Sequence, residues 1–519
     1  MRERLKAVRV LIRRGMVEPS RPDRAVRVFA ALRRYGPFGG LTTYGATRYG
    51  DDPAVTDEFG TLSFAELEGA SNALARGLLD HGVGPGAVLA VLYRNHRGVL
   101  MALSAANKIG ARVVLMNTGF AGPQLAEVCL RENVAAVLAD DEFAEVLAMV
   151  PRSIRRLALD EVAQGRRPTA MPAPSRPGGM VLLTSGTTGT PKGAPRNRID
   201  PLQTAQLLDR IPWPAGGSYV VAAPLFHATG LATCALGLAL GNRVVLARRF
   251  DPEATLAAIE KYRAGALISV PTMLQRILDL GPDVLARSDT SSLTVLFAAG
   301  SALSPDLCRR TAAAFGDVLY NLYGSTEVAA AAIATPAELR LAPGTVGRPP
   351  LGCRLACYDE QRRLITEPGR TGTLFVASGL SFTGYTDGGQ KEIVNGLLST
   401  GDTGHFDESG LWFVDGRDDD MIVSGGENVF PLEVENLLDG HPEIIEAAVI
   451  GVDDPDFGKR LRAFVVVNTD ATLDADGVKA FVRTQLARHK VPRDVVFVDG
   501  LPRNETGKLL KRRLAEMPV

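Results

Sequence analysis

The stretch that decides the fold is MVLLTSGTTGTPKG, Met180–Gly193, in which an apolar strand runs into a polar loop. Met180–Leu183 is a short continuous apolar run, which is typical of a buried strand. From Thr184 to Gly193, every residue except Pro191 and Lys192 is Gly, Ser or Thr. Glycines let backbone N–H groups approach an anion closely, hydroxyl groups add donors, and lysine adds a point charge suited to phosphate. The stretch predicts a polyphosphate-binding loop, with a polar connector as the alternative.

This loop differs from a Walker loop in one decisive position. Gly193 follows Lys192, where a Walker loop has the Ser or Thr that ligates Mg²⁺. The loop also does not open directly into a helix, because the next helix signal is Asp200-Pro201. We therefore predict a flexible phosphate clamp of a different kind.

On both sides of the loop the sequence alternates between strand and helix patterns. Val88–Leu92 and Arg112–Met116 are apolar throughout, and the stretch Gly122–Glu132 between later strands has a helical pattern. Strands without polar alternation, separated by helices, indicate a mostly parallel sheet that is covered on both faces. A Pro-rich linker, Met171–Gly179, interrupts the alternation, which resumes as far as about Tyr323.

The composition and the predicted secondary structure of the sequence change twice after this region. Beyond Gly344, short segments rich in Gly and Pro predict a small β-rich unit. After Gly416, a compact α/β piece is expected, with a helix that starts at Pro431 and ends before Gly440. Its further elements are expected at these positions: strands Ala447–Val452 and Ala463–Val467, and a helix around Val478–His489. The predicted class is α/β, with an N-terminal domain of doubly wound sheets over residues 1–416 and a smaller C-terminal domain over 417–519.

Composition excludes several classes of protein. The 519 residues are 46% apolar and 22% charged, which is ordinary for a globular protein and excludes disorder, collagen and a disulfide miniprotein. The 58 basic and 58 acidic side chains balance, so nucleic acid or an anionic membrane is not expected as the main partner. Five scattered cysteines fit a reducing cytoplasm. Cys353 and Cys357 lack a nearby His or second Cys pair, so we do not predict a metal there.

Membrane insertion and export are not predicted. The most apolar run, Leu231–Leu240, is shorter than the roughly 18–20 residues that a span needs. The N-terminus, MRERLKAVRVLIRRGM, is basic and lacks the clean apolar stretch of a secretory signal. We expect a helix that packs on its own domain; a membrane-surface helix is the alternative, so that any membrane contact is peripheral.

Six motifs in order support a resemblance to a known superfamily. TSGTTGTPKG resembles the phosphate loop of the adenylate-forming enzymes: acyl-CoA synthetases, peptide-synthetase adenylation domains and firefly-luciferase-like proteins. The other five motifs stand at these positions: PLFHATG at Pro224–Gly230, YGSTE at Tyr323–Glu327, STGD at Ser399–Asp402, DGRDDDMIVSGGENVFP at Asp415–Pro431, and NETGK at Asn504–Lys508. Within this superfamily the chain is most similar to a bacterial fatty-acyl-CoA synthetase.

The resemblance implies a reaction in two halves. A carboxylate attacks the α-phosphate of ATP to give an acyl-adenylate and pyrophosphate, and the thiol of coenzyme A then displaces AMP. By resemblance, Glu327 is a catalytic residue and the Mg²⁺ ligand, and Thr326 is a catalytic hydroxyl at the α-phosphate. The resemblance also implies these residues for ATP or AMP: Thr184, Ser185, Gly186, Thr187, Thr188, Gly189, Lys192, Tyr323, Gly324, Ser325, Asp402 and Arg417. Among them, Asp402 is expected on the ribose hydroxyls, and Tyr323 either stacks near adenine or is a buried core residue.

Lys508 is the residue for which the resemblance implies the most specific catalytic role. In similar enzymes this lysine bridges the attacking carboxylate and the α-phosphate, so it acts by positioning and electrostatics. Lys511, three residues later, is expected to be an exposed helix lysine and thus a built-in control.

The resemblance also implies a moving C-terminal domain. Lys508 serves the first half-reaction, and the thiol needs the same carbonyl afterwards, so a pivot between the domains is the expected solution. Asp419 falls at the hinge position of the family, within a hinge at about 415–420. Ser424, Gly425 and Gly426 resemble the loop that lines the channel for the coenzyme A thiol arm.

An acyl pocket is expected beside the ATP site. His227 resembles a family position between the two sites, either catalytic or lining the pocket. The remaining candidates for this pocket are Ala299, Gly300, Ser301 and Gly324. The small apolar segments Ala298–Ser301 and Val328–Ala332 suit a long or bulky hydrophobic acid, unless they reflect simple close packing.

The choice of substrate and acceptor is only partly narrowed. Pro224–Gly230 contains no acid that would hold an ammonium group, so an α-amino acid is disfavoured. The sequence stops eleven residues after Lys508 and contains no carrier-protein attachment motif, which favours a standalone enzyme that uses free coenzyme A. Two alternatives remain: an acyl-AMP ligase that loads a separate carrier protein in natural-product synthesis, and a protein that runs one half-reaction or neither. A homodimer is left open.

Overall fold

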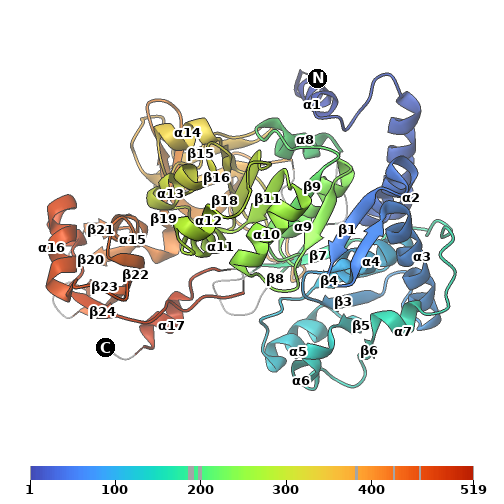
Figure 1. Cartoon of the computed structure of the whole chain (residues 1–519). Helices are drawn as coiled ribbons and strands as arrows, with labels where there is room; N and C mark the ends of the chain where they lie inside the picture. The colour runs from blue at the N-terminus through green and yellow to red at the C-terminus, as the bar shows by residue number, and fades with distance from the viewer. Residues whose placement is uncertain are drawn as a thin grey trace.

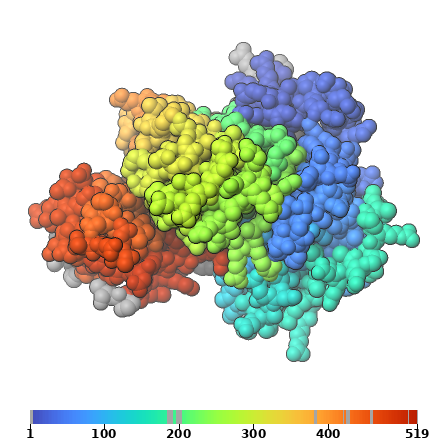
Figure 2. All heavy atoms as spheres, in the orientation of Figure 1, coloured from blue at the N-terminus to red at the C-terminus, as the bar shows by residue number. Residues whose placement is uncertain are grey.

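The structure is a computed structural model that describes residues 2–184, 192–196, 201–379, 384–424, 427–454, 458–505 and 507–517. Two mostly parallel sheets with helices on their faces form the larger part of the molecule, and two smaller sheets follow (Figure 1). In the space-filling view the C-terminal residues form a lobe at one end, remote from the first helices (Figure 2). The predicted α/β class is confirmed.

An eight-stranded sheet lies at the centre of the larger part. Its order is β14-β13-β12-β11-β9-β10-β1-β2, and it is parallel except for the edge strands β2 and β14. Its strands are β1 Pro53–Asp57, β2 Gly60–Ser63, β9 Ser218–Val221, β10 Arg243–Leu246, β11 Ala266–Ser269, β12 Val295–Ala299, β13 Leu319–Tyr323 and β14 Ala332–Ala334. The chain runs from β9 outward to β10 and then returns to β11 on the other side of β9. An open α/β sheet binds its ligands beyond the carboxyl ends of the strands at such a switch point.

A six-stranded sheet packs beside it, with the order β6-β5-β3-β4-β7-β8. Its strands are β3 Val88–Leu92, β4 Arg112–Leu115, β5 Val134–Ala139, β6 Arg155–Leu157, β7 Met180–Thr184 and β8 Lys192–Arg196. Only β8 is antiparallel, and Thr184 at the end of β7 pairs with Lys192 at the start of β8. The glycine- and threonine-rich loop therefore leaves and re-enters the sheet at these two residues.

Helices cover both sheets and join their parallel strands. They are α3 Phe64–Asp80, α4 Arg97–Lys108, α5 Gly122–Arg131, α6 Ala144–Leu147, α7 Leu159–Ala163, α8 Pro201–Asp209, α9 Ala228–Ala239, α10 Pro252–Tyr262, α11 Pro271–Leu278, α12 Pro282–Leu285, α13 Pro305–Phe315 and α14 Pro336–Leu341. Several begin at a proline, whose missing N–H is not needed in a first turn. Among the described helices, none has both the length and the hydropathy that crossing a membrane requires.

Two helices precede the first strand. α1 (Arg2–Arg13) packs against α8, and its buried side chains are Ala7, Val10 and Leu11. α2 (Pro22–Tyr49) is kinked at Gly36, beside Pro37, and its second half is buried against the core. The expectation that the basic N-terminus forms a helix packed on its own domain is thus correct.

The small β-rich unit is an antiparallel sheet, as the Gly- and Pro-rich texture predicted. Its strands are β15 Arg354–Tyr358, β16 Gly372–Ala377, β17 Ile393–Val394, β18 Leu397–Phe406 and β19 Trp412–Arg417. A 3₁₀ turn, Asp418–Asp420, then leads into the last sheet.

The C-terminal sheet has the order β21-β20-β23-β22, with β24 beside β23. Its elements are β20 Ile422–Ser424, β21 Glu427–Val429, α15 Pro431–Leu438, β22 Ile444–Asp454, β23 Gly458–Val467, α16 Ala475–Gln485, β24 Asp494–Phe497 and α17 Lys511–Ala515. The helix predicted around Val478–His489 begins earlier, because the Asp474 side chain accepts the N–H of Gly477 at 2.8 Å and caps the first turn.

Candidate active site

The predicted site residues gather at the carboxyl ends of three parallel strands. His227 follows β9 and is the N-cap residue of α9, Ser301 follows β12, and Tyr323 ends β13. Ser325–Glu327 continue directly from β13. The switch point of the eight-stranded sheet therefore brings together segments that lie almost a hundred residues apart.

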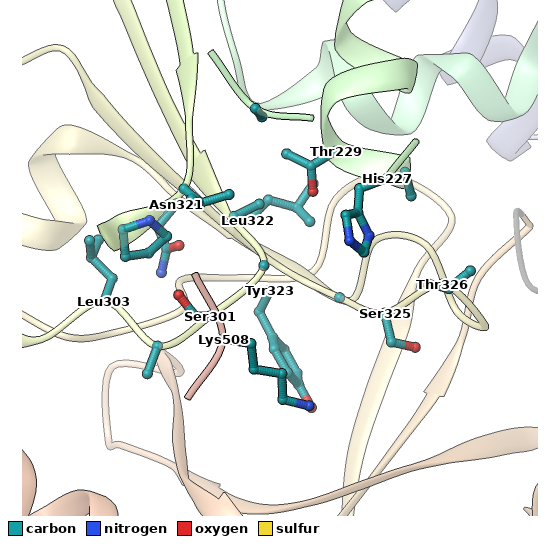
Figure 3. A pocket seen from close by; sticks show the side chains of 18 of the residues that line it. His227, Thr229, Ser301, Leu303, Asn321, Leu322, Tyr323, Ser325, Thr326 and Lys508 are labelled. Carbon is teal, nitrogen blue, oxygen red and sulfur yellow. The ribbon is translucent and has the colours of Figure 1, made fainter. Parts of the chain in front are cut away.

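One large cavity, of about 2040 Å³, connects these residues. It extends from the N-terminal helices, past the strand ends, to the inner side of the C-terminal sheet. His227, Tyr323, Ser325 and Lys508 all line this cavity, and Figure 3 shows their side chains close to one another. Strands of the large sheet and the C-terminal loop thus contribute to a single site.

Glu327 is a buried carboxylate held by two neighbours. Its side chain is 7% exposed, its Oε1 accepts a hydrogen bond from the hydroxyl of Tyr385 at 2.6 Å, and its backbone N–H donates to the hydroxyl of Ser325 at 3.2 Å. Burial opposes ionisation, but the bonds from Tyr385 and Ser325 and the charge of Lys391 outweigh it and lower the pKa of Glu327. An ionised, buried carboxylate that faces a polar cavity fits a Mg²⁺ ligand.

Tyr385 and Lys391 are functional candidates that the sequence did not reveal. Both lie in the segment between β16 and β18, which has no recognisable motif. The ammonium of Lys192 lies 5.2 Å from the ring centre of Tyr385 and 3.4 Å from the carboxylate of Asp387. This segment therefore connects the end of the phosphate loop with Glu327.

Asp402 is linked to both of its predicted neighbours. Its Oδ2 accepts a 2.6 Å hydrogen bond from the hydroxyl of Tyr323, and its Oδ1 lies 3.3 Å from a guanidinium nitrogen of Arg417. Arg417 is the residue opposite Asp402 in the β18–β19 pair. Burial raises the pKa of Asp402, although Tyr323 and Arg417 oppose the rise. Tyr323 lines the cavity, and its hydroxyl is anchored on the acid.

Gly324 has no room for a side chain. A Cβ atom at this position would lie 1.8 Å from the carbonyl oxygen of Ala329. The turn after β13 therefore requires glycine, and Ser325 and Thr326, which follow it, line the cavity.

Lys508 reaches the cavity from a short hairpin of the C-terminal part. Asn504 closes this hairpin, because its N–H donates to the carbonyl of Lys508 at 2.9 Å and its side-chain oxygen accepts the N–H of Lys508 at 2.8 Å. The ammonium of Lys508 has no hydrogen-bond or ion-pair partner within the described ranges. It is available to an anionic ligand.

Two contacts dock this hairpin onto the large sheets. A Cβ atom on Gly507, whose φ is +76°, would lie 1.9 Å from the hydroxyl oxygen of Thr272, so the backbone of Gly507 lies directly against the Thr272 side chain. Glu505 forms an ion pair of 3.4 Å with Arg94. The hairpin thereby touches both the eight-stranded and the six-stranded regions.

The expectation for Lys511 is wrong. Lys511 is the first residue of α17, its side chain is only 28% exposed, and its ammonium lies 3.5 Å from the carboxylates of Asp420 and Glu435. Asp420 and Glu435, which come from preceding elements, both lie next to the start of α17 and hold the Lys511 ammonium against the protein surface. Lys511 is therefore no neutral control for Lys508.

His227 lines the cavity as a neutral ring. Its Nε2 is buried and has no hydrogen-bond partner in the described structure, and the ring contacts Phe226 in a tilted arrangement with 4.8 Å between centres. Burial lowers the pKa of His227 to about 4. An uncharged imidazole with a vacant nitrogen can orient a polar group of a ligand.

The apolar end of the cavity lies between α9 and the N-terminal helices. Four alanines at helical spacing, Ala228, Ala232, Ala235 and Ala239, line it on α9, and most other side chains of this helix are buried. Opposite them stand Leu11, Met16, Val17, Val28, Leu32 and Leu41. Single methyl groups on one wall leave a groove along α9, which is about 18 Å long at 1.5 Å per residue.

The predicted acyl-pocket residues are partly placed there. Ala299, Gly300, Ser301 and Gly324 all line the cavity. Within Val328–Ala332, however, only Ala329 lines it, while its neighbours are fully buried in packed clusters. For that segment the close-packing alternative is correct.

Some of the predicted site residues lie wholly or partly outside the described residues. Ser185, Gly186, Thr187, Thr188, Gly189, Gly425 and Gly426 lie outside the described residues, and only the backbone is described for Thr184, Asp419 and Ser424. All five cysteines are free, and no cluster of His, Cys, Asp or Glu in the described part of the chain is arranged to hold a metal.

Comparison with known proteins agrees with this architecture. The family model described as "AMP-binding enzyme" matches residues 43–386, and "AMP-binding enzyme C-terminal domain" matches residues 433–508. An indoleacetate–CoA ligase of Aromatoleum aromaticum is 34% identical over 87% of this chain and 92% of its own length. A fatty acid–[acyl-carrier-protein] ligase, ScoC, of Streptomyces coeruleorubidus is 30% identical over 92% and 95%.

A solved structure shares the fold over nearly the whole chain. The o-succinylbenzoate CoA synthetase of Bacillus subtilis, in complex with its acyl-adenylate intermediate, superposes with a TM-score of 0.81 at 26% identity and covers 92% of this chain and 98% of its own. The chain belongs to the family of AMP-binding, adenylate-forming enzymes. Within this family it is an acid–thiol ligase.

Proposed function

We propose that the chain is an ATP-dependent acyl-CoA ligase for hydrophobic carboxylic acids with an extended apolar tail. It would form an acyl-adenylate with release of pyrophosphate and then transfer the acyl group to coenzyme A with release of AMP. The observation that carries this proposal is the position of Lys508, which lines one cavity together with Glu327 and Asp402. Adenylation needs three groups in one place: a cation that is unpaired among the described residues, a buried carboxylate, and an acid that can bind the ribose hydroxyls.

The first half-reaction assigns a role to each of these side chains. Lys508 would hold the substrate carboxylate and the α-phosphate together against their repulsion. Asp402 would accept hydrogen bonds from the ribose hydroxyls, with Arg417 beside it. Thr326 and Lys192 would contact phosphate oxygens, and Lys192 already lies at the re-entry of the phosphate loop.

Mg²⁺ would be held by Glu327, because this carboxylate is buried, ionised and steadied by Tyr385. When bound, the ion would neutralise charge on the phosphates of ATP. The chain's own contribution is to keep Glu327 ionised although this carboxylate is buried.

The second half-reaction would require the C-terminal domain, 417–519, to move relative to 1–416. β19 belongs to the β-rich sheet and β20 to the C-terminal sheet, so the chain passes between them through the single turn Asp418–Asp420. Because this turn is not paired with a strand, the C-terminal domain could rotate about it without breaking strand hydrogen bonds. This supports a hinge at Asp419. Ser424, Gly425 and Gly426 follow directly and would line the thiol channel after rotation.

The acyl tail would lie along the alanine face of α9. The carboxyl group would sit near His227 at the start of the helix, and the tail would extend toward Leu32 and Leu41. This groove is apolar on both sides, which disfavours a charged or strongly polar tail. The relatives' names, which include aromatic and fatty acids, are compatible with a hydrophobic substrate.

A carrier protein is the specific alternative to coenzyme A as the acyl acceptor. The similarity to ScoC supports a second candidate function, in which the acyl group passes to the thiol of a separate carrier protein. Pyrophosphate release and thioester formation should be measured with straight-chain and aromatic acids, with coenzyme A and with a holo-carrier protein as acceptors. Pyrophosphate release without any thioester would contradict both candidates, and a thioester only on the carrier would select the second.

A variant in the groove tests the substrate class. Ala235→Phe should lower thioester formation from long straight-chain acids by about tenfold or more, because a ring would fill the groove, and spare short ones. Ala286→Phe, at an exposed position outside the cavity, is the matched control. If Ala235→Phe leaves the ratio of rates for long and short acids as it is in the parent chain, the tail lies elsewhere.

A further inference from the structure

The N-terminal helices differ in charge from the rest of the chain. We define the N-terminal hairpin as residues 2–34, which comprise α1, the connecting loop and the first part of α2. This stretch contains eleven Lys and Arg side chains against three Asp and Glu, whereas the whole chain is balanced at 58 of each. It also lies before residue 43, where the match to the family model begins.

Two of the three acids of the hairpin, Glu18 and Asp23, form ion pairs with arginines. Glu18 forms ion pairs with Arg24 and Arg48, and Asp23 pairs with Arg21. By contrast, a larger set of cations in the hairpin forms no ion pair within the described part of the chain: Arg4, Lys6, Arg9, Arg27 and Arg33. The excess positive charge of the hairpin is therefore directed to the solvent.

The outward faces of the hairpin are also apolar. In α1, Leu5, Val8 and Ile12 are 57%, 38% and 39% exposed, although they recur at the spacing of one helix face. In α2, Val26 and Phe29 are 68% and 59% exposed. Large apolar side chains between unpaired arginines are typical of a helix that lies in a membrane interface.

The inward faces of the same two helices form the distal wall of the apolar groove. Leu11, Val28 and Leu32 line the cavity and face α9. One thin layer of two helices thus separates the groove from the basic apolar surface. In Figure 2 the N-terminal residues lie away from the C-terminal lobe, so a partner on the hairpin leaves that lobe free.

We propose that the outward face of the N-terminal hairpin docks the enzyme on an anionic lipid bilayer. The arginines would lie at the level of the phosphate groups, and Leu5, Val26 and Phe29 would enter the boundary of the acyl chains. This contact goes beyond the proposed function. It would place the groove of the enzyme beside the phase in which hydrophobic acids dissolve.

Co-sedimentation of the full chain with vesicles tests the proposal. The chain should bind vesicles of phosphatidylcholine mixed with phosphatidylglycerol, bind poorly to phosphatidylcholine alone, and dissociate at high salt. Arg27→Gln combined with Arg33→Gln should weaken binding by about tenfold. Val26→Ser combined with Phe29→Ser should weaken it at least as much.

Matched controls lie elsewhere on the surface. Leu341, which is 82% exposed, and the exposed Arg287 are remote from the hairpin in sequence, so Leu341→Ser and Arg287→Gln should bind vesicles like the parent chain. Pyrophosphate release with a short acid in free solution should be the same in all variants, which shows that they are folded. Vesicle binding without any adenylation would overturn the proposed function and leave the docking intact.

Three results would overturn the docking. The first is no binding to the mixed vesicles, and the second is equal binding by the parent chain and both hairpin variants. The third is a dimer in light scattering that dissociates in the Val26→Ser, Phe29→Ser variant, because a second copy of the chain would then cover the face.

Discussion

The hydroxyl group of Tyr385 donates a 2.6 Å hydrogen bond to Oε1 of Glu327, and this bond joins two segments 58 residues apart. It connects the turn after β13 with the segment that carries Lys391 and Asp387. Because Glu327 is buried, its charge depends on such donors. Tyr385 is therefore a positioning residue for the carboxylate that we propose as the Mg²⁺ ligand.

Tyr385→Phe tests this role through pH. Loss of the donor should raise the pKa of Glu327, so that the acidic limb of the pH profile of adenylation moves to higher pH and more Mg²⁺ is required. A hydrogen bond to a charged group contributes about 1.5–3 kcal/mol, which sets the scale of the loss. Tyr262→Phe, on α10 outside the cavity, should leave the profile unchanged. An unshifted acidic limb in Tyr385→Phe would contradict the assignment.

Lys508→Ala should reduce acyl-adenylate formation from acid and ATP by about 10²–10³-fold, the scale for loss of one group that stabilises transition-state charge. Thioester formation from a supplied acyl-adenylate should be largely spared, because the ammonium acts only in the first half-reaction. Lys261→Ala, at an exposed lysine of α10 outside the cavity, replaces Lys511 as the control. An equal loss of both half-reactions in Lys508→Ala would refute this role.

Asp402→Ala should weaken ATP binding by about 2–3 kcal/mol, because hydrogen bonds to a charged group are lost. The apparent affinity is read from the ATP dependence of pyrophosphate release. Asp476→Ala, at a side chain that is 92% exposed, is the control for removal of an acid. If Asp402→Ala leaves the ATP dependence unchanged, STGD is only a turn.

Asp418→Pro tests the hinge more cleanly than a proline at Asp419. Arg417 is extended, with φ −90° and ψ 141°, as the residue before a proline should be, and Asp418 begins the 3₁₀ turn. Proline at 418 therefore fits the present turn and restricts its rotation. Pyrophosphate release should persist and thioester formation should fall by about tenfold or more, if rotation limits the second half-reaction.

The two half-reactions have to be measured separately on this variant. A parallel loss of both would show a distorted junction, and no loss in either would place the hinge elsewhere.

The site residues that could be predicted from the sequence are those that lie in short, recognisable segments. His227 and Tyr323 are recognisable because their motifs resemble those of the family, and Ser301 because its segment is small and apolar. In the structure all three lie at the carboxyl ends of parallel strands, which meet at one edge. The C-terminal sheet and the β-rich unit were also predictable from local texture. Periodicity and turn residues act over short distances, and such features survive in a single sequence.

Contacts between distant segments could not be predicted in this way. Tyr385 lies in a segment without a pattern, and nothing local connects it to Glu327. Lys511 has an ordinary helix-start sequence, and only the folded chain brings Asp420 to it. The alanines of α9 were visible only as part of an apolar run, because their role depends on which helix faces them.

The hairpin that carries Lys508 meets the large sheets through a close backbone approach and an ion pair. The contacts described here are the close approach of Gly507 to Thr272 and the partly exposed pair of Glu505 with Arg94. Exposed ion pairs contribute about 0–1 kcal/mol, so the pair of Glu505 with Arg94 adds little to the stability of the docked position. The bound ligand can then shift the balance between the docked and the undocked position of the hairpin. ATP or coenzyme A does so to the extent that its affinity differs between the two positions.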